Sequence, residues 1–120
     1  MGIAEIEDNI IVKLSFEFAL LIIVLAEELQ VERKYVIANQ ILKSGTSIGA
    51  NICEAQNAES KADFIHKMKI SAKECEETKY WLMLCKYSKD YPSHEHLLEK
   101  IEVLLKILNK IIATSKRRIS

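Results

Sequence analysis

Apolar residues recur at alternating steps of three and four along four successive stretches of the chain. This spacing places them on one side of an α-helix, and nowhere do β-branched and aromatic residues alternate with the period of two that is typical of strands. The pattern predicts helices over residues 9–29, 34–57, 61–88 and 93–115. The sequence therefore indicates an all-α fold in a single domain of residues 1–120.

The breaks between the predicted helices are short. The first covers only residues 30–33, and Ser60 with Asp63 three residues later resembles a capping box at the start of the third helix. A Tyr-Pro-Ser turn precedes the fourth helix, with Ser93 as the expected N-cap. Because short connections make consecutive helices antiparallel neighbours, we expect an antiparallel up-down-up-down four-helix bundle.

The first and fourth predicted helices carry more apolar residues than one core-facing stripe needs. Beside its main stripe, the first helix has a second line that includes Phe16 and Ile23, and the fourth has Leu98, Leu105 and Ile112. A lone bundle needs about one apolar stripe per helix, so the surplus predicts burial against other copies of the chain. We therefore expect a homo-oligomer.

The stretch LKSGTSIGANICEA at residues 42–55 has the composition of a loop but the spacing of a helix. Apolar positions such as Ile41 and Ile48 continue the pattern through both glycines. Each interior glycine costs roughly 1 kcal/mol relative to alanine, so we expect a gain that offsets it, namely the close approach of another helix backbone at Gly45-x-x-x-Gly49. A phosphate-binding loop would need a strand before it and a Gly-Lys pair, and the sequence has neither.

A line of small polar side chains lies beside these glycines on the same predicted helix. Its members are Gln40, Ser44, Ser47, Asn51 and Glu54. The solvated faces of the other helices carry Lys and Glu instead, so this line favours hydrogen bonds inside the fold or across an interface. Exposure of these side chains to water is the alternative interpretation.

Composition points to an intracellular protein. The three cysteines, Cys53, Cys75 and Cys85, are odd in number and form no Cys-x-x-Cys pair, so neither a disulfide framework nor a zinc site is indicated. The longest apolar run, residues 18–26, is far below the ~20 residues that span a bilayer. The first residues include Glu5 rather than the basic flank of a secretory signal. We expect a cytoplasmic protein with no membrane partner.

Three segments carry the most distinctive strings of the sequence. They are residues 40–55 (QILKSGTSIGANICEA), 60–68 (SKADFIHKM) and 73–82 (KECEETKYWL), and the last contains Glu77 and Trp81. Together they resemble the bacterial four-helix bundle family whose founding members are encoded in intervening sequences of large-subunit ribosomal RNA genes. The resemblance implies up-down four-helix subunits arranged in a ring, typically a pentamer, and it implies no enzymatic activity.

A relative in this fold is the accessory variability protein of diversity-generating retroelements. That relative is strongly basic and is understood to bind nucleic acid and a reverse transcriptase. The present chain departs from it, because 17 Lys and Arg residues are balanced by 17 Asp and Glu residues. This departure argues against the retroelement role.

Charge is unevenly distributed even though the net charge is zero. Residues 1–60 hold 4 Lys or Arg against 9 Asp or Glu, a net −5, whereas residues 61–120 hold 13 against 8, a net +5. In the predicted bundle, the start of the third helix and the end of the fourth lie at the same end. This arrangement would gather Lys61, Lys67, Lys69, Lys110, Lys116, Arg117 and Arg118. Such a cluster can bind the phosphates of RNA or DNA.

The alternative interpretation of this basic end is a solvated rim with a basic tail. Glu5, Glu7 and Asp8 would partly neutralise it, and the sequence predicts no aromatic residues there on which bases could stack.

Carboxylates on the predicted second and third helices raise the question of a metal site. Glu54, Glu74 and Glu77 could converge with Asn51, as inward-facing carboxylates do in di-iron bundles, but the Glu-x-x-His pairs of such sites are absent. We therefore expect no metal and no cofactor. Glu54 and Glu77 are predicted instead to join Asn51 or nearby lysines in a structural polar network, or to lie at a subunit interface.

The leading function hypothesis is a non-enzymatic, nucleic-acid-associated accessory or scaffold protein that uses its basic end. The alternative is a protein–protein interaction scaffold that binds no nucleic acid. A metal-dependent enzyme ranks third, because the Glu-x-x-His pairs of such metal sites are absent. Spacing indicates no Ser-His-Asp or Cys-His arrangement either. His94 and His96 are expected to lie in a solvated turn rather than to bind metal.

Overall fold

The computed structural model describes residues 9–119 of the chain, and the side chains of residues 9–117. Over that range there is no strand, and the four α-helices are α2 (Ile10–Val31), α3 (Tyr35–Ala55), α4 (Lys61–Tyr87) and α5 (Glu95–Ile119). The predicted all-α class is confirmed. α5 begins after the expected cap Ser93 and continues past residue 115, because no Gly or Pro follows there to stop the helix.

Side chains cap the N-termini of α2 and α4. Asn9 Oδ1 accepts a hydrogen bond from the Val12 N–H at 3.4 Å, and Ser60 Oγ accepts one from the Asp63 N–H at 3.0 Å. Asp63 Oδ2 also accepts from the Glu59 N–H at 3.2 Å. The expected cap at Ser60 is confirmed, and its return bond reaches one residue before the cap.

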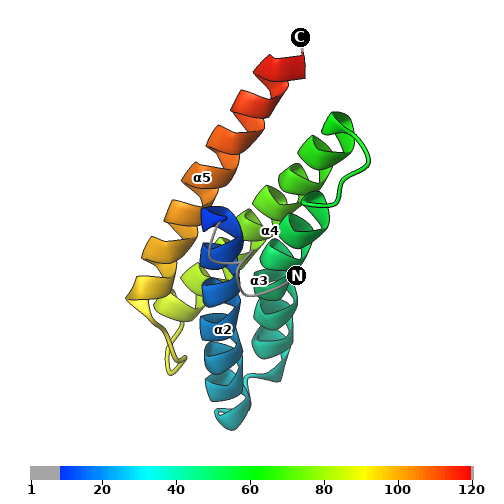
Figure 1. Ribbon diagram of the computed structural model, residues 1–120. Coiled ribbons are helices and arrows are strands. Elements are labelled where there is room, and N and C mark those ends of the chain that lie inside the picture. Colours follow the sequence, from blue (N-terminus) through cyan, green and yellow to red (C-terminus); the bar gives the residue numbers. More distant parts are fainter. Residues whose placement is uncertain (1–8, 120) are drawn as a thin grey trace.

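The helices pack as neighbours in chain order. α2 packs against α3, α3 against α4 and α4 against α5, and α2 also contacts α5. Figure 1 shows that α5 and the connection between α3 and α4 extend beyond the N-terminal end of α2. At that end of the molecule, no residue of α2 lies between α5 and the start of α4.

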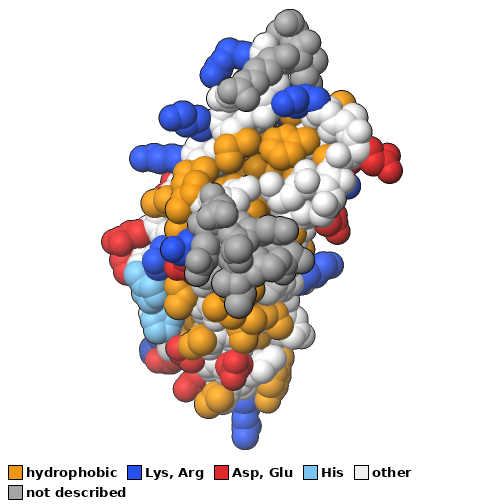
Figure 2. Space-filling model, in the orientation of Figure 1, with side chains coloured by type: hydrophobic (Ala, Val, Ile, Leu, Met, Phe, Trp, Pro, Cys, Tyr) orange, Lys and Arg blue, Asp and Glu red, His pale blue; other side chains and the backbone are white. Residues whose placement is uncertain are grey.

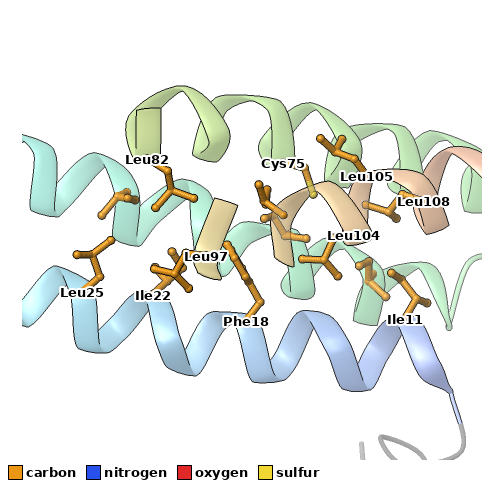
Figure 3. Packing of buried hydrophobic residues seen from close by; sticks show 14 of the residues in the cluster. Ile11, Phe18, Ile22, Leu25, Cys75, Leu82, Leu97, Leu104, Leu105 and Leu108 are labelled. Atoms are coloured by element: carbon orange, nitrogen blue, oxygen red, sulfur yellow. The ribbon is translucent and has the colours of Figure 1, made fainter. Parts of the chain in front are cut away.

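Buried side chains from all four helices form one core. Figure 3 shows Phe18 and Ile22 of α2 pointing toward Leu97 and Leu104 of α5, with Cys75 of α4 on the other side of the core. All three cysteines are free thiols. Burial raises the pKa of the Cys75 thiol to about 12, so this thiol stays protonated and unreactive at neutral pH.

Residues 42–55 lie inside α3, which confirms the helix interpretation of this stretch. A Cβ added at Gly45 would lie 2.8 Å from Ile22 Cγ2, well inside the ~3.5 Å at which carbon atoms normally approach. A Cβ at Gly49 would lie 3.4 Å from Ser15 Oγ, which is an ordinary contact. Gly45 therefore leaves the space that the Ile22 side chain of α2 fills, whereas Gly49, which faces the Ser15 backbone, leaves space for a methyl group.

Exposed apolar surface is found on α2 but hardly on α5. Phe16 and Val24 of α2 keep 48% and 54% of their surface exposed. On α5, Leu105 and Ile112 are buried and Leu98 is half-buried, because α2 and α4 both pack against this helix. The expectation of a wide exposed apolar face on the fourth helix is therefore wrong. None of the described helices is long and apolar enough to cross a membrane.

Candidate nucleic-acid interface

Two lysine pairs form at the end of the molecule where α4 begins and α5 ends. Lys61 of α4 and Lys110 of α5 line the same groove. The side chains of Lys69 and Lys116 lie in contact, and this contact, with the repulsion between the two charges, lowers the pKa of Lys69. Within residues 9–117, none of these four lysines forms an ion pair with a carboxylate.

The other members of the predicted basic cluster have different surroundings. Lys67 Nζ lies 3.5 Å from Asp63 Oδ1, so a carboxylate partly neutralises it. Arg117 Nη2 donates to Thr114 Oγ1 at 3.3 Å. Outside the described side chains lie Arg118 and the three carboxylates expected to neutralise this end, Glu5, Glu7 and Asp8.

The two lysine pairs occupy different sides of α5. Successive helical residues turn by about 100°, so Lys110 and Lys116 project roughly 120° apart around the helix. Figure 2 shows Lys and Arg side chains around the upper part of the molecule, with apolar surface between them. The predicted single cluster is thus divided, and the groove contains only the first pair.

A groove of about 630 Å³ opens between the end of α3, the first turn of α4 and the last turns of α5. It lies at the end where α5 extends beyond α2 (Figure 1). Its apolar surface comes from Ala55, Ala58, Phe64 and Ile111, its polar groups from Gln56, Ser60, Thr114 and Ser115, and its two charges from Lys61 and Lys110.

The walls of the groove are fixed by the fold. Phe64 and Ile111 pack against the buried core as well as lining the groove. Gln56 Nε2 donates to the Ile52 carbonyl at 3.0 Å, and Gln56 Oε1 accepts from Asn9 Nδ2 at 3.0 Å. The groove therefore needs little ordering before it can bind a ligand.

Phe64 is the groove residue that sequence reasoning missed. Its spacing from other apolar residues predicts a core-facing position on the third helix, and no aromatic residue was expected at the basic end. It lies in the first turn of α4, beyond the cover of α2, and it remains half-buried beside Lys61. The expectation that aromatic side chains are missing from this end is wrong.

The polar line on α3 is only partly internal. Ser44 is buried, and the Thr78 hydroxyl of α4 donates to Ser44 Oγ at 2.9 Å. Ser47 Oγ and Asn51 Nδ2 donate to carbonyl oxygens of their own helix at 2.6 and 2.8 Å. The exposed ends of the line are Gln40 and Glu54. Ser44 is thus hydrogen-bonded inside the fold, whereas Gln40 and Glu54 are exposed to water.

The structure does not bring Glu54 and Glu77 together. Glu77 precedes Thr78, which contacts Ser44, whereas Glu54 lies ten residues after Ser44, about 15 Å farther along α3. Both glutamates are exposed. Among the residues that the structure describes, no group of three or more His, Cys, Asp or Glu could hold a metal ion. The hypothesised convergence with Asn51 is therefore not formed.

Trp81 and His94 have surroundings that the sequence did not predict. Trp81 packs against the core and meets Tyr80 edge-on, with ring centroids 5.3 Å apart, and its buried Nε1 has no acceptor in the described part of the chain. His94 Nε2 lies 3.0 Å from Glu28 Oε2 and so ties the connection before α5 to α2. His94 is therefore not simply part of a solvated turn.

Residues 7–110 match the family model described as 23S rRNA-intervening sequence protein. The chain belongs to this family. The match confirms the resemblance carried by residues 40–82. A solved structure from Bacteroides thetaiotaomicron, described as a protein with unknown function from the S23 ribosomal protein family, is 42% identical to the chain. The similarity covers 86% of this chain and 98% of that one, with a TM-score of 0.79. Comparison with curated proteins finds no match.

The 23S rRNA-intervening sequence family model covers α2, α3, α4 and most of α5. Both charged residues of the groove, Lys61 and Lys110, fall within the matched range. Lys116, which contacts Lys69, lies beyond that range. The groove pair is thus part of the region shared with the family model, whereas the second lysine pair is only half inside it.

Proposed function

We propose that this member of the intervening-sequence family is a non-enzymatic, nucleic-acid-associated accessory or scaffold protein that contacts phosphates through its basic end. The observation that carries the proposal is the pair Lys61 and Lys110, which flank one groove and have no carboxylate partner within residues 9–117. In contrast, Lys79 is held by Glu102 at 2.6 Å on the same two helices. Lysines without a carboxylate partner are free to neutralise phosphates.

We further propose that the subunits are up-down-up-down bundles that assemble in the cytoplasm into a homo-oligomeric ring, a pentamer as the family resemblance implies. The exposed Phe16, Leu20 and Val24 on α2 support burial against another copy. A ring would repeat the basic end around its axis and strengthen binding to a long nucleic acid through several simultaneous contacts. Light scattering measures the mass in solution, and a monomer at micromolar concentration would contradict this assembly.

Binding to labelled structured RNA and single-stranded DNA, titrated at low and moderate salt, tests the proposed function. We expect Lys61→Ala with Lys110→Ala to weaken binding and to lower the slope of log affinity against log salt by about two, because each lost phosphate contact lowers it by about one. The matched control is Lys89→Ala with Lys100→Ala, which removes the same charge from exposed positions outside the groove.

Equal losses in the two double variants would contradict a site at the groove end. No binding of the wild-type protein at low salt would contradict the nucleic-acid function itself. A stoichiometric metal in the purified protein would contradict the non-enzymatic assignment.

A protein–protein interaction scaffold is the second candidate function. It is favoured by exposed Tyr80, Met83 and Tyr87 on α4, which border a shallow depression of about 450 Å³. Aromatic and Met side chains are enriched where proteins meet. This candidate predicts a protein partner that Tyr80→Ser with Tyr87→Ser releases, together with no binding to nucleic acid.

A further inference from the structure

We infer that the groove between α4 and α5 takes an unpaired nucleobase of a single-stranded nucleic acid. The base packs against Phe64, and Lys61 and Lys110 contact the phosphates on either side of it. This inference rests on the proposed function, and it names the form of nucleic acid that the basic end binds.

The groove has the size and lining of a site for a small ring system. Its volume of about 630 Å³ lies within the ~300–1,000 Å³ typical of small-molecule sites. Phe64 and Ile111 supply apolar surface, while Gln56, Ser60 and Thr114 supply hydrogen-bonding groups. Proteins bind unpaired bases with this combination, since an aromatic side chain contacts the flat face of the base and polar groups reach its edge.

The charges are placed for a strand that crosses the groove. Lys61 lies on the α4 wall and Lys110 on the α5 wall. Neither is bound to a carboxylate within residues 9–117. Lys61 is also the first residue of α4, where the positive end of the helix dipole adds to its charge. A base that enters the groove carries a phosphate on each side, so a cationic group on each wall matches it.

The exposed aromatic surface of α4 lacks these features. Tyr80 and Tyr87 lie beside Lys79, but Lys79 Nζ is bound to Glu102 Oε1 at 2.6 Å. Glu76 lies in the same depression. A phosphate there would meet a carboxylate and a neutralised lysine, so stacking on this surface would have no electrostatic support.

Single strands and duplexes differ in what Phe64 can contribute. In a duplex the faces of the bases are stacked on one another, so Lys61 and Lys110 could reach phosphates while Phe64 would remain unused. In a single strand the face of a base is available to the ring. The contribution of Phe64 to affinity therefore separates the two forms of nucleic acid.

Affinities for an oligoadenylate, an abasic strand with the same number of phosphates and a duplex of equal length test the inference. We expect the wild-type protein to bind the oligoadenylate at least about fivefold more tightly than the abasic strand, because stacking of one base contributes about that factor or more. Phe64→Leu keeps an apolar side chain but removes the ring, so it should lose this preference and keep its affinity for the abasic strand and the duplex. Tyr80→Leu removes an aromatic ring outside the groove and should retain the preference.

The outcomes separate the inference from the function on which it rests. If the wild-type protein binds the oligoadenylate no better than the abasic strand, the inference is overturned whether or not Phe64→Leu folds, and the proposed phosphate-binding function stands. Loss of the preference in Tyr80→Leu would also overturn it. The inference would also be overturned if polyglutamate competed for binding as strongly as oligoadenylate does, since the groove would then accept an acidic protein segment. Failure of the wild-type protein to bind any of the three ligands removes the proposed function as well.

Discussion

The α2–α3 pair and the α4–α5 pair meet in different ways. α2 and α3 approach so closely that a Cβ at Gly45 would collide with Ile22. α4 and α5 are joined near the connection between them by Lys79–Glu102 at 2.6 Å, and at their other end they flank an open groove. In the α2–α3 pair, the size of a side chain at the contact determines stability. In the α4–α5 pair, lysines without a carboxylate partner remain available at the surface. Substitutions at the α2–α3 contact should therefore change stability more than substitutions of the exposed charges on α4 and α5.

The largest effect is expected from filling the α2–α3 contact. Gly45→Leu must push the two helices apart, which should lower the free energy of unfolding by about 3 kcal/mol. Gly49→Ala tests the position with space, because a Cβ there would lie 3.4 Å from Ser15 Oγ, and it should be neutral or stabilise by up to about 1 kcal/mol. Urea denaturation measures both. Equal destabilisation by the two substitutions would show that close approach is not concentrated at Gly45.

A smaller effect on the melting temperature is expected from removing a lysine of α4. Its sign should differ between the two ends of the α4–α5 pair. Lys79→Ala removes the attraction to Glu102 and should lower the melting temperature slightly. Lys69→Ala removes the repulsion from Lys116 and should leave the melting temperature unchanged or raise it. Both differences should shrink in high salt, which screens exposed charges. A loss of stability in Lys69→Ala would contradict the repulsive contact.

The smallest effect is the change with pH in the contributions of Lys79 and Lys69 to stability. The hydrogen bond and charge of Glu102 raise the pKa of Lys79, so its stabilising contribution is fully present below the pKa of an unfolded lysine and is lost as pH rises through the raised value. Contact with Lys116 lowers the pKa of Lys69, so its unfavourable contribution is relieved as pH rises through the lowered value. The free energy of unfolding of Lys69→Ala and of Lys79→Ala is measured against wild type in alkaline buffers. The difference between Lys69→Ala and wild type should disappear at a lower pH than the difference between Lys79→Ala and wild type. Disappearance in the reverse order would contradict these directions.

The helices were predictable because apolar residues spaced by three and four lie on the side of each segment that faces a neighbouring helix. Gly45 could be interpreted in the same way, since the apolar spacing continued through it. The end of α5 could not, because no Gly or Pro after residue 115 marks a stop in the sequence. Ser44 was correctly placed among the internal hydrogen bonds, but spacing could not show that Gln40 and Glu54 on the same line are exposed.

The groove depends on features that a linear pattern does not contain. Spacing placed Phe64 on an inner stripe, yet an inner stripe faces open space where a helix extends beyond its neighbour. The relative axial position of α2 and α5 decides this, and it follows from three-dimensional packing. The direction of each lysine around its helix likewise divides the predicted basic cluster, since Lys67 turns toward Asp63 and Lys69 toward Lys116.

Gln56 links the groove to the first turn of α2. Its Oε1 accepts from Asn9 Nδ2 at 3.0 Å, and Asn9 Oδ1 accepts from the Val12 N–H at 3.4 Å. A ligand that draws Gln56 into the groove would compete with Asn9 for this amide and weaken the cap. Hydrogen exchange of the Val12 amide with solvent should therefore quicken when the groove fills.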